Sequence, residues 1–325
     1  MADEVGERFD RYMARCLYGP DGFYASTGTA GRSRGDFITS PEVGPLFGAV
    51  IANVVDRWWE ALGRPDPLKV YDVGCGPGTL LKSVRLARPD RPWELIGVDV
   101  VTAAGADSAE LPGDLSGAVV LGNELLDNLP FRIVTAELDE PAEVFVHGDP
   151  PAERLVAADV PLSVAAGKRA PYLEEANRWV TSVLNRNPAV LCLLDYGAPT
   201  TAELVDRGGW LRTYRAHQRG SDPLVTPGLC DITTDVAWDQ LPTPDSLVSQ
   251  AEFLRAGGIQ DLVDEGRQFW NEHAAAPDLT AIRMRSRVAE AKALLDEDGL
   301  GGWWVGTWVG TGIGTGVGTE SPDRR

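Results

Sequence analysis

The chain has 325 residues and a formal net charge of −18 at pH 7, and 43% of its residues are hydrophobic. This length and composition support a buried core, in one elaborated α/β domain or in two smaller domains. The strong negative charge argues against a protein that wraps nucleic acid or binds an anionic membrane surface. Two explanations of the charge stay open, a basic protein partner and simple solubility.

The four cysteines are widely spaced and include no Cys-x-x-Cys pair. We therefore expect neither a zinc site nor a disulfide framework. The first residues, MADEVGERFDRYM, are acidic and amphipathic and contain no apolar targeting segment. No apolar run reaches the roughly 18 residues that a membrane span needs. These features predict a cytoplasmic protein without a metal and without membrane insertion.

Residues 1–65 are predicted to form an N-terminal helical cap that contains a loop. The segment SPEVGPLFGAVIANVVDRWWEALG (40–63) places its apolar residues on one continuous helix face. Ser40 and Pro41 predict the N-cap and first helical position, and Gly63 predicts the stop. The preceding residues 18–39 are rich in glycine and aperiodic. That composition is typical of a lid or binding loop and equally of a plain surface loop.

From residue 68 the pattern changes to apolar strands separated by turns and helices. Four continuous apolar runs follow one another along the chain: LKVYDV, WELIGVDVV, GAVVL and AVLCLLDY. The helix LLKSVRLA lies between the first two. Such runs predict parallel strands that are buried on both faces. The predicted fold is therefore α/β, a doubly wound Rossmann-like sheet that binds its ligands at the carboxyl ends of the strands.

The remaining elements complete one main domain, which we predict over residues 66–310. Two insertions, at about 131–170 and 198–245, are expected to face the substrate. The first begins with a hairpin pattern and is followed by a helix over 170–185, whereas the second is irregular. After them we predict a helix, a glycine turn and a strand within 248–264, a helix over 280–295 and a last strand in GGWWVGTWVG. The Gly-Thr repeat of residues 311–325 is predicted to be disordered.

The turn VGCGPGTL after the first strand predicts a cofactor site. Gly74, Gly76 and Gly78 let the backbone approach a ligand closely, and they precede a helix N-terminus. Their G-x-G-x-G spacing differs from the dinucleotide fingerprint. Asp72 suits an ammonium group, and Asp99 ends the next strand, where a carboxylate binds a ribose diol. A ligand with a cationic amino acid at one end and a ribose at the other is S-adenosylmethionine.

The stretch GNELLDNLP (122–130) places two acids and two asparagines directly after a buried strand. Asn123 and Asp127 have an ordinary explanation as caps of the following turn. The alternative is chemistry at the strand end, beside the glycine loop, with Glu124 as the leading candidate and Asp127 and Asn123 as its partners. Both interpretations stay open from the residues alone.

With these motifs the chain resembles the MidA family of S-adenosylmethionine-dependent methyltransferases. The resemblance runs from about Tyr18 to about Leu254 and rests on YGPDGFY, GDFITSPEVGPLFG, VYDVGCGPGTL, NELLDNLP, LLDYG, LRTYRAHQRGSDPLVTPGLCDITTDV and QAEFL. Mitochondrial members of this family are complex I assembly factors that dimethylate a protein arginine. The sequence departs from the family between Asp99 and Val119, where the stretch is short and poor in helix-forming residues.

The resemblance implies a class I methyltransferase sheet and an arginine on a protein as the methyl acceptor. It makes a respiratory-complex subunit a candidate substrate and leaves a homodimer open. A carboxylate such as Glu124 would grip the guanidinium and orient the reacting nitrogen. The resemblance also implies that the segment before the long helix folds over the cofactor, with Thr39 and Glu42 favoured over Asp36 and Ser40.

Further acceptor contacts are expected from Asp195 and Tyr196 at the end of the fourth strand. His147 and His273 are expected on the surface, and His217 keeps a smaller chance of a substrate role. Two other functions stay open. One is methylation of a small oxygen or nitrogen nucleophile, which commonly needs a His or Lys base or a metal. The other is a non-enzymatic assembly protein that retains the cofactor fold.

Overall fold

The computed structural model describes residues 6–26, 39–100, 106–136, 140–215 and 218–310. The chain forms two compact units. Unit 1 consists of Met1–Phe37, Leu125–Ser182 and Gly197–Thr243, and unit 2 consists of Ile38–Glu124, Val183–Tyr196 and Pro244–Arg325. The predicted division at residue 65 falls inside unit 2, and the described part of the first 37 residues groups with the two predicted insertions. The predicted tail, residues 311–325, lies outside the described residues.

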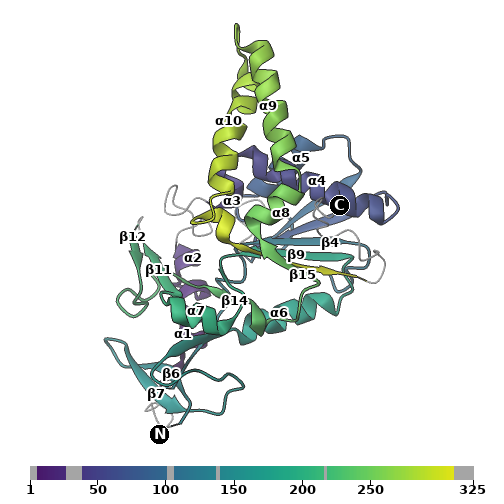
Figure 1. Cartoon of the computed structure of the whole chain (residues 1–325). Coiled ribbons are helices and arrows are strands. Elements are labelled where there is room, and N and C mark those ends of the chain that lie inside the picture. Colours follow the sequence, from purple (N-terminus) through teal and green to yellow (C-terminus); the bar gives the residue numbers. More distant parts are fainter. Residues whose placement is uncertain (1–5, 27–38, 101–105, 137–139, 216–217, 311–325) are drawn as a thin grey trace, which may run out of the picture. The chain divides into compact units, whose positions relative to one another are not determined.

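Unit 2 contains a six-stranded sheet in the order β15-β16-β9-β4-β2-β3 (Figure 1). The four strands predicted from apolar runs are its parallel part: β2 (Leu68–Val73), β3 (Trp93–Val98), β4 (Val119–Asn123) and β9 (Val190–Asp195). Two further strands extend it: β15 (Ser246–Ser249) and β16 (Trp304–Val309). Strand β16 runs antiparallel to both β9 and β15. The predicted α/β class is confirmed, and the sheet is mixed because β16 is antiparallel.

The register of the parallel strands brings their carboxyl ends to one edge of the sheet. Val73 at the end of β2 pairs with Val98 at the end of β3 and with Gly122 of β4. Asn123 pairs with Leu194 of β9. Every residue of β4 and β9 is buried, as continuous apolar runs predict for a central parallel sheet. Polar residues that follow these strands are therefore neighbours.

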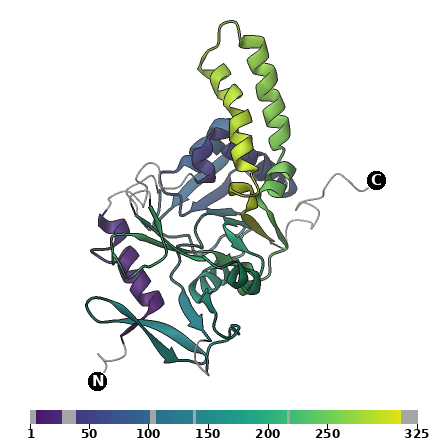
Figure 2. The ribbon, with the colours of Figure 1, turned by 60° about the vertical axis from the view of Figure 1, so that its left-hand side comes forward.

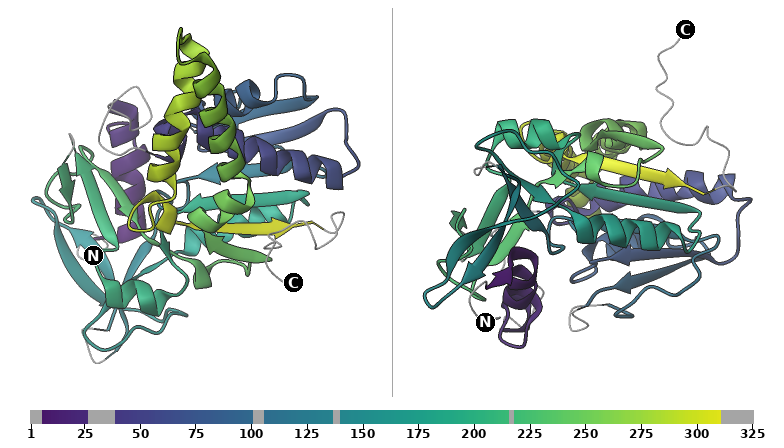
Figure 3. Two further views of the ribbon diagram at one scale, coloured as in Figure 1. Left: turned by 45° about the horizontal axis from the view of Figure 1, so that its top comes forward. Right: turned by 90° about the horizontal axis from the view of Figure 1, so that it is seen from below.

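Six helices are found in the described residues of unit 2, and they pack together with the sheet residues (Figure 3). They are α3 (Ser40–Val43), α4 (Pro45–Ala61), α5 (Thr79–Ala87), α8 (Gln250–Ala256), α9 (Ile259–His273) and α10 (Leu279–Leu294), followed by the 3-10 turn η3 (Leu300–Gly302). Helices α9 and α10 form a pair that extends away from the sheet (Figure 2). The apolar face of α4 supplies much of the shared core, including Phe47, Val50 and Trp58.

Two details of unit 2 correct the sequence predictions. The helix predicted over 40–63 is broken at Gly44 into α3 and α4, and Thr39 takes the N-cap position of α3 instead of Ser40. The predicted stop is right, because Gly63 follows the C-cap residue with φ of 81°. The strand predicted after the glycine turn in 248–264 is wrong, since residues from Ile259 onward form α9. Its buried residues, Ile259, Val263 and Gly266, have helical spacing.

The part of unit 1 that the structure describes is built from short strands and four helices (Figure 1). Its largest sheet has the order β1-β6-β5-β8, with β7 paired to β6. The strands are β1 (Glu7–Arg8), β5 (Arg132–Thr135), β6 (Ala142–His147), β7 (Ala152–Ala157) and β8 (Arg169–Tyr172), and the helices are α1 (Phe9–Tyr18), α2 (Phe23–Ser26), α6 (Glu174–Leu184) and α7 (Thr201–Arg207). The predicted hairpin is confirmed as the antiparallel pair β5–β6.

The region predicted as irregular, 198–245, is more regular than expected. It contains a sheet of order β12-β11-β13 and a parallel pair β10–β14. The elements are β10 (Gly197–Ala198), β11 (Leu211–Arg215), β12 (Gln218–Gly220), β13 (Asp231–Thr234), β14 (Val236–Ala237) and the 3-10 turn η2 (Trp238–Gln240). These strands are too short to give a clear alternation, so the sequence did not reveal that they pair with one another. Among the described residues, no helix has the length and apolar composition to span a membrane.

Candidate functional site

The glycine loop lies where the sequence placed it, between the end of β2 and the start of α5. Gly74, Gly76 and Gly78 all have positive φ, of 70°, 51° and 72°. Side chains rarely tolerate this region, so glycine is needed at each position. Gly78 is the N-cap of α5 and offers no side chain to cap it. The loop therefore combines close backbone access with a free helix N-terminus, which together suit a polar ligand.

Two acids flank this loop, as predicted. Asp72 lies in β2 and is only 3% exposed. Asp99 follows β3, and its Oδ2 accepts a hydrogen bond of 2.9 Å from the backbone N–H of Gly76. The carboxylate at the end of β3 thus holds the glycine loop directly. The assignment of Asp72 to an ammonium group and of Asp99 to a ribose remains a prediction, and the positions of both acids beside the loop are compatible with it.

The described residues 106–108 lie beside the end of β3. The N–H of Asp107 donates to the carbonyl of Gly97 at 2.8 Å, and its side chain accepts from the N–H of Gly97 at 2.9 Å. Ser108 forms a parallel bridge with Val98. The described part of this stretch contains no helix, in agreement with its composition, and residues 101–105 lie outside the described part.

The end of β4 carries the strongest local signal of function. Glu124 has φ of 53°, one of only three non-glycine residues with positive φ in the described chain, and its N–H is anchored to the carbonyl of Leu194 at 2.9 Å. A long side chain in this region costs energy, and such strain clusters at functional sites. The turn thereby fixes the direction in which Glu124 leaves the sheet edge.

Asn123 orients the Glu124 side chain. Its Nδ2 donates to Glu124 Oε1 at 2.9 Å. Asn123 is 6% exposed, and its Oδ1 makes no hydrogen bond to any residue that the structure describes. A buried amide oxygen without a donor is costly and commonly marks a position that a ligand or water fills. No helix begins at Asn123 among the described residues, and its role in the site remains a prediction beside the simpler one of capping the turn.

Asp127, the second predicted acid, belongs to unit 1. It is 4% exposed, and its carbonyl accepts from the N–H of Thr234 at 3.1 Å. The following residue, Asn128, bonds the Tyr24 hydroxyl and Asp231. Burial raises the pKa of Asp231 to about 6, and the pKa of Tyr24 is raised by burial and by the Asp231 carboxylate. A catalytic pairing of Glu124 with Asp127 remains a prediction.

The segment predicted to cover the cofactor is described from Thr39 onward, and Asp36 lies outside the described residues. Thr39 is 6% exposed, and its Oγ1 makes no hydrogen bond within the described chain. Glu42 is exposed on α3. Ser40 is fully buried and donates to Gln250 Oε1 at 2.9 Å. Ser40 therefore has a structural partner, whereas Thr39 presents an orphaned hydroxyl.

The remaining candidates are the residues at the end of β9, the three histidines and Cys75. Asp195 is fully buried at the end of β9, and its Oδ1 accepts from the N–H of Tyr196 at 2.9 Å. The Tyr196 ring packs on Trp303. His147 and His273 are exposed, as expected, and His217 lies outside the described residues. Burial, together with Asp72, Asp99 and Asp107, raises the pKa of Cys75 to about 12, so this thiol is no nucleophile.

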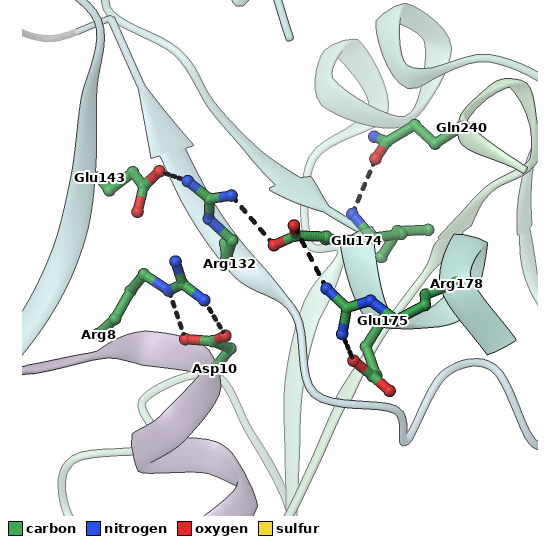
Figure 4. Close-up of polar contacts among 9 residues, drawn as sticks. Arg8, Asp10, Arg132, Glu143, Glu174, Glu175, Arg178 and Gln240 are labelled. Carbon is green, nitrogen blue, oxygen red and sulfur yellow. Dashed lines mark hydrogen bonds and ion pairs between the residues drawn. The ribbon is translucent and has the colours of Figure 1, made fainter. Parts of the chain in front are cut away.

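A separate pocket of about 290 Å³ in unit 1 does not qualify as the site. It lies among α1, β5 and α6 and is lined largely by charged residues (Figure 4). Arg132 pairs with Glu143 and Glu174, and Arg178 pairs with Glu174 and Glu175. Arg8 pairs with Asp10 at 2.7 Å. These charged side chains pair with one another, so we interpret them as ion pairs that stabilise unit 1 and not as a ligand site.

The glycine loop, the acid after β3 and the polar end of β4 all lie at one edge of a parallel sheet. That arrangement defines a nucleoside-binding α/β protein whose ligand carries a second polar group at the loop. Comparisons with known proteins narrow this class. Residues 106–254 match a family model, Methyltransf_28, which describes S-adenosyl-L-methionine-dependent methyltransferases.

Two curated relatives are mitochondrial protein arginine methyltransferases of the NDUFAF7 type. The Drosophila melanogaster homolog is 26% identical over 283 residues, which cover 69% of this chain and 63% of that protein. The Mus musculus protein is 25% identical over 286 residues, which cover 71% of this chain and 64% of that protein. The chain thus spans slightly less than two thirds of the length of these relatives.

Two crystal structures of Burkholderia thailandensis proteins share the fold, each with a TM-score of 0.77 and covering 94% of this chain and 88% of the other. One is a native structure at 24% identity, and the other, at 26% identity, is bound to S-adenosyl-homocysteine. These similarities support the MidA-like family of S-adenosylmethionine-dependent methyltransferases, the family that the motifs of the chain resemble. The cofactor of this family is S-adenosylmethionine.

Sequence reasoning missed two buried residues beside the predicted cofactor cover, Gln250 and Glu290. Gln250 lies in the QAEFL motif, and its position before an apolar helix gave a signal that we assigned to the helix alone. Glu290 gave no signal, because a glutamate on a charged helix is normally exposed.

Proposed function

We propose that this protein is an S-adenosylmethionine-dependent methyltransferase that methylates an arginine side chain of a protein substrate. The observation that carries the proposal is Glu124, held at positive φ at the end of β4 and oriented by Asn123. The family assignment supports the methyltransferase part, and the two NDUFAF7-type relatives support the arginine.

The residues at the sheet edge fit the cofactor. Three glycines with positive φ leave room for a ligand against the backbone. Asn123 Oδ1 and Thr39 Oγ1 are buried polar atoms that lack a hydrogen bond within the described chain. Asp72 would face the amino-acid portion and Asp99 the ribose. When bound, the cofactor supplies an electrophilic methyl group on a sulfonium.

The acceptor side of the chemistry falls to Glu124. A guanidinium is positively charged and delocalised, so it is a weak nucleophile until its charge is drawn away from one nitrogen. A carboxylate that accepts from two N–H groups does this and fixes the third nitrogen. The nitrogen forms a bond to carbon as the carbon–sulfur bond breaks, and one proton leaves the product nitrogen. That proton leaves to water, because Glu124 holds the other two nitrogens, and alignment supplies much of the acceleration.

The remaining features are proposed with the same function. The substrate is a protein, and a subunit of a respiratory complex is the candidate that the resemblance suggests. A net charge of −18 favours a basic substrate segment and disfavours nucleic acid. We also propose a cytoplasmic location and a doubly wound, class I methyltransferase arrangement of the sheet.

The test combines binding with transfer. Calorimetry with S-adenosyl-homocysteine should show binding to the wild type and to Glu124→Gln with affinities within about threefold. Transfer of labelled methyl groups to a cell extract, followed by acid hydrolysis, should yield methylarginine with the wild type and none with the variant. Glu110→Gln, an exposed acid in the same unit, is the matched control and should transfer normally.

Each part of the proposal can fail separately. Absence of S-adenosyl-homocysteine binding at millimolar ligand rejects the methyltransferase. Label in small metabolites but not in methylarginine rejects the arginine acceptor. Normal turnover by Glu124→Gln rejects the role of that carboxylate.

A further inference from the structure

Helix α4 begins without a cap of its own. Its N-cap residue is Gly44, which has no side chain, and the preceding α3 is a single short turn. The first N–H groups of a helix need acceptors, and a missing cap leaves the entry to the helix loosely defined. The joint between α3 and α4 therefore depends on something outside the local sequence.

Glu290 of α10 supplies the missing cap. Its Oε2 accepts a 2.9 Å hydrogen bond from the N–H of Leu46 in the first turn of α4. Its Oε1 accepts from the Ser286 hydroxyl. Glu290 is 6% exposed, and no ion pair joins it to an arginine or lysine among the described residues. The positive N-terminal end of α4 and the Ser286 hydroxyl are the partners of this buried carboxylate.

Gly44 is required for this contact. A Cβ at position 44 would lie 2.3 Å from the Glu290 carboxyl carbon and 2.4 Å from Oε2. Any side chain there would displace the carboxylate from the N-terminus of α4. The glycine and the glutamate, almost 250 residues apart in sequence, thus form one joint.

A second contact holds the other end of the segment. Ser40 donates to Gln250 Oε1 at 2.9 Å, and Gln250 Nε2 reaches the carbonyl of Leu294 at 3.5 Å. Ser40 and Gln250 are both fully buried. Together, Ser40, Gln250 and Glu290 form a buried polar clamp that ties α3 to α8 and α10.

The clamped segment is the one that carries Thr39 and Glu42. Helix α3 packs against α5, whose first residue follows Gly78 of the glycine loop. Thr39 Oγ1 is buried without a hydrogen bond inside the described chain, which marks it as an atom awaiting a partner. The orientation of α3 decides where this hydroxyl points.

We propose that Glu290 is a positioning residue for cofactor binding, which acts by capping α4 and thereby fixing α3 and Thr39 beside the glycine loop. The inference rests on the proposed function, because it assigns the clamp to the same cofactor site. It makes α10 part of the binding machinery, although α10 contributes no predicted ligand contact.

The test measures S-adenosyl-homocysteine affinity by calorimetry on the full chain, well below the melting temperature. Glu290→Ala should bind about tenfold more weakly than the wild type, as expected when a cap that orders the site is lost. Glu290→Gln should bind within about threefold, because its amide oxygen still accepts from the Leu46 N–H. An affinity of Glu290→Gln close to that of the wild type would show that the hydrogen bond to the helix N-terminus matters, and not the negative charge of Glu290.

Asp278→Ala is the matched control. Asp278 caps the start of the same helix α10, where its side chain accepts from the Ala281 N–H at 2.7 Å. The control also removes a helix cap, so it should lower the melting temperature like Glu290→Ala. It should leave the affinity for S-adenosyl-homocysteine unchanged, because it does not contact α3 or α4.

Hydrogen exchange on the ligand-free variants gives a readout independent of binding. Glu290→Ala should accelerate exchange of the Leu46 amide and of the α3 amides, whereas Asp278→Ala should not. The proposal is overturned if Glu290→Ala leaves either the affinity or this exchange unchanged, or if Asp278→Ala weakens binding equally. If the wild type itself fails to bind S-adenosyl-homocysteine, the proposed function falls, and unchanged exchange would still refute the clamp separately.

Discussion

Helices α4 and α5 approach each other at Gly48 more closely than any side chain allows. A Cβ at position 48 would lie 2.3 Å from the Cβ of Ser83, 3.0 Å from its carbonyl carbon and 3.1 Å from the N of Val84. Ordinary carbon–carbon contacts are about 3.5–4.0 Å. Two of these atoms are backbone, so a change of side-chain rotamer cannot relieve the clash. Gly48→Ala therefore increases the distance between the two helices by about 1 Å.

Two opposing effects set the magnitude. Overpacking of a core costs about 1–3 kcal/mol. Alanine gains about 1 kcal/mol over glycine in a helix interior. We expect Gly48→Ala to lower the free energy of unfolding by up to about 2 kcal/mol, the opposite of the usual effect of alanine in a helix. Since α5 follows the glycine loop, affinity for S-adenosyl-homocysteine should fall as well.

The assay is a double-mutant cycle by urea-induced unfolding. Ser83→Gly removes the atom that clashes, so it should destabilise the wild type but restore stability in the Gly48→Ala background. The coupling free energy should exceed about 1 kcal/mol, well above the few tenths found for independent sites. A stabilised Gly48→Ala variant, or additive effects in the cycle, would refute the close approach of α4 and α5.

Two further predictions follow from the ionisable groups. Burial raises the pKa of Asp231 from 3.8 to about 6, so the folded state binds the proton more tightly and stability falls as pH rises from about 4 to about 6. Asp231→Asn should therefore be more stable than the wild type at pH 7, by at most about 3 kcal/mol. Thermal melts should show that this difference disappears below pH 4. A variant that is less stable than the wild type at pH 7 would contradict the prediction. Burial raises the pKa of Cys75 to about 12, so iodoacetamide at pH 8 should alkylate this thiol far more slowly in the folded protein than after unfolding. The alkylation rates are measured by mass spectrometry, and equal rates in the two states would rule out the burial of Cys75.

The sequence determined the parallel sheet and the loop that follows β2. Continuous apolar runs such as that of β9 are typical of strands buried on both faces, and glycines at 74, 76 and 78 specify a turn with three positive φ angles that other residues rarely adopt. These signals are local, because each depends on the side chains of a few successive residues. The same holds for the stop of α4 at Gly63.

Long-range contacts decided what the sequence left open. The break at Gly44 depends on the Glu290 carboxylate of α10, and the residues near Gly44 in the sequence do not predict this contact. The short strands of 198–245 gain their pairing from one another, and composition alone could not reveal it. The strand predicted in 248–264 was wrong because Ile259 and Val263, four residues apart, fit both a strand and a helix, and only the burial of Gly266 adds the helical spacing.

The candidate site shows the same division. Sequence identified Glu124 as an unusual acid after a buried strand, but it left the choice between a cap and a reactive group open. Only the tertiary structure shows the positive φ of Glu124, its anchor on Leu194 and the orphaned oxygen of Asn123. Backbone strain and unsatisfied burial arise when distant segments enclose a residue, so they exist only in the folded chain.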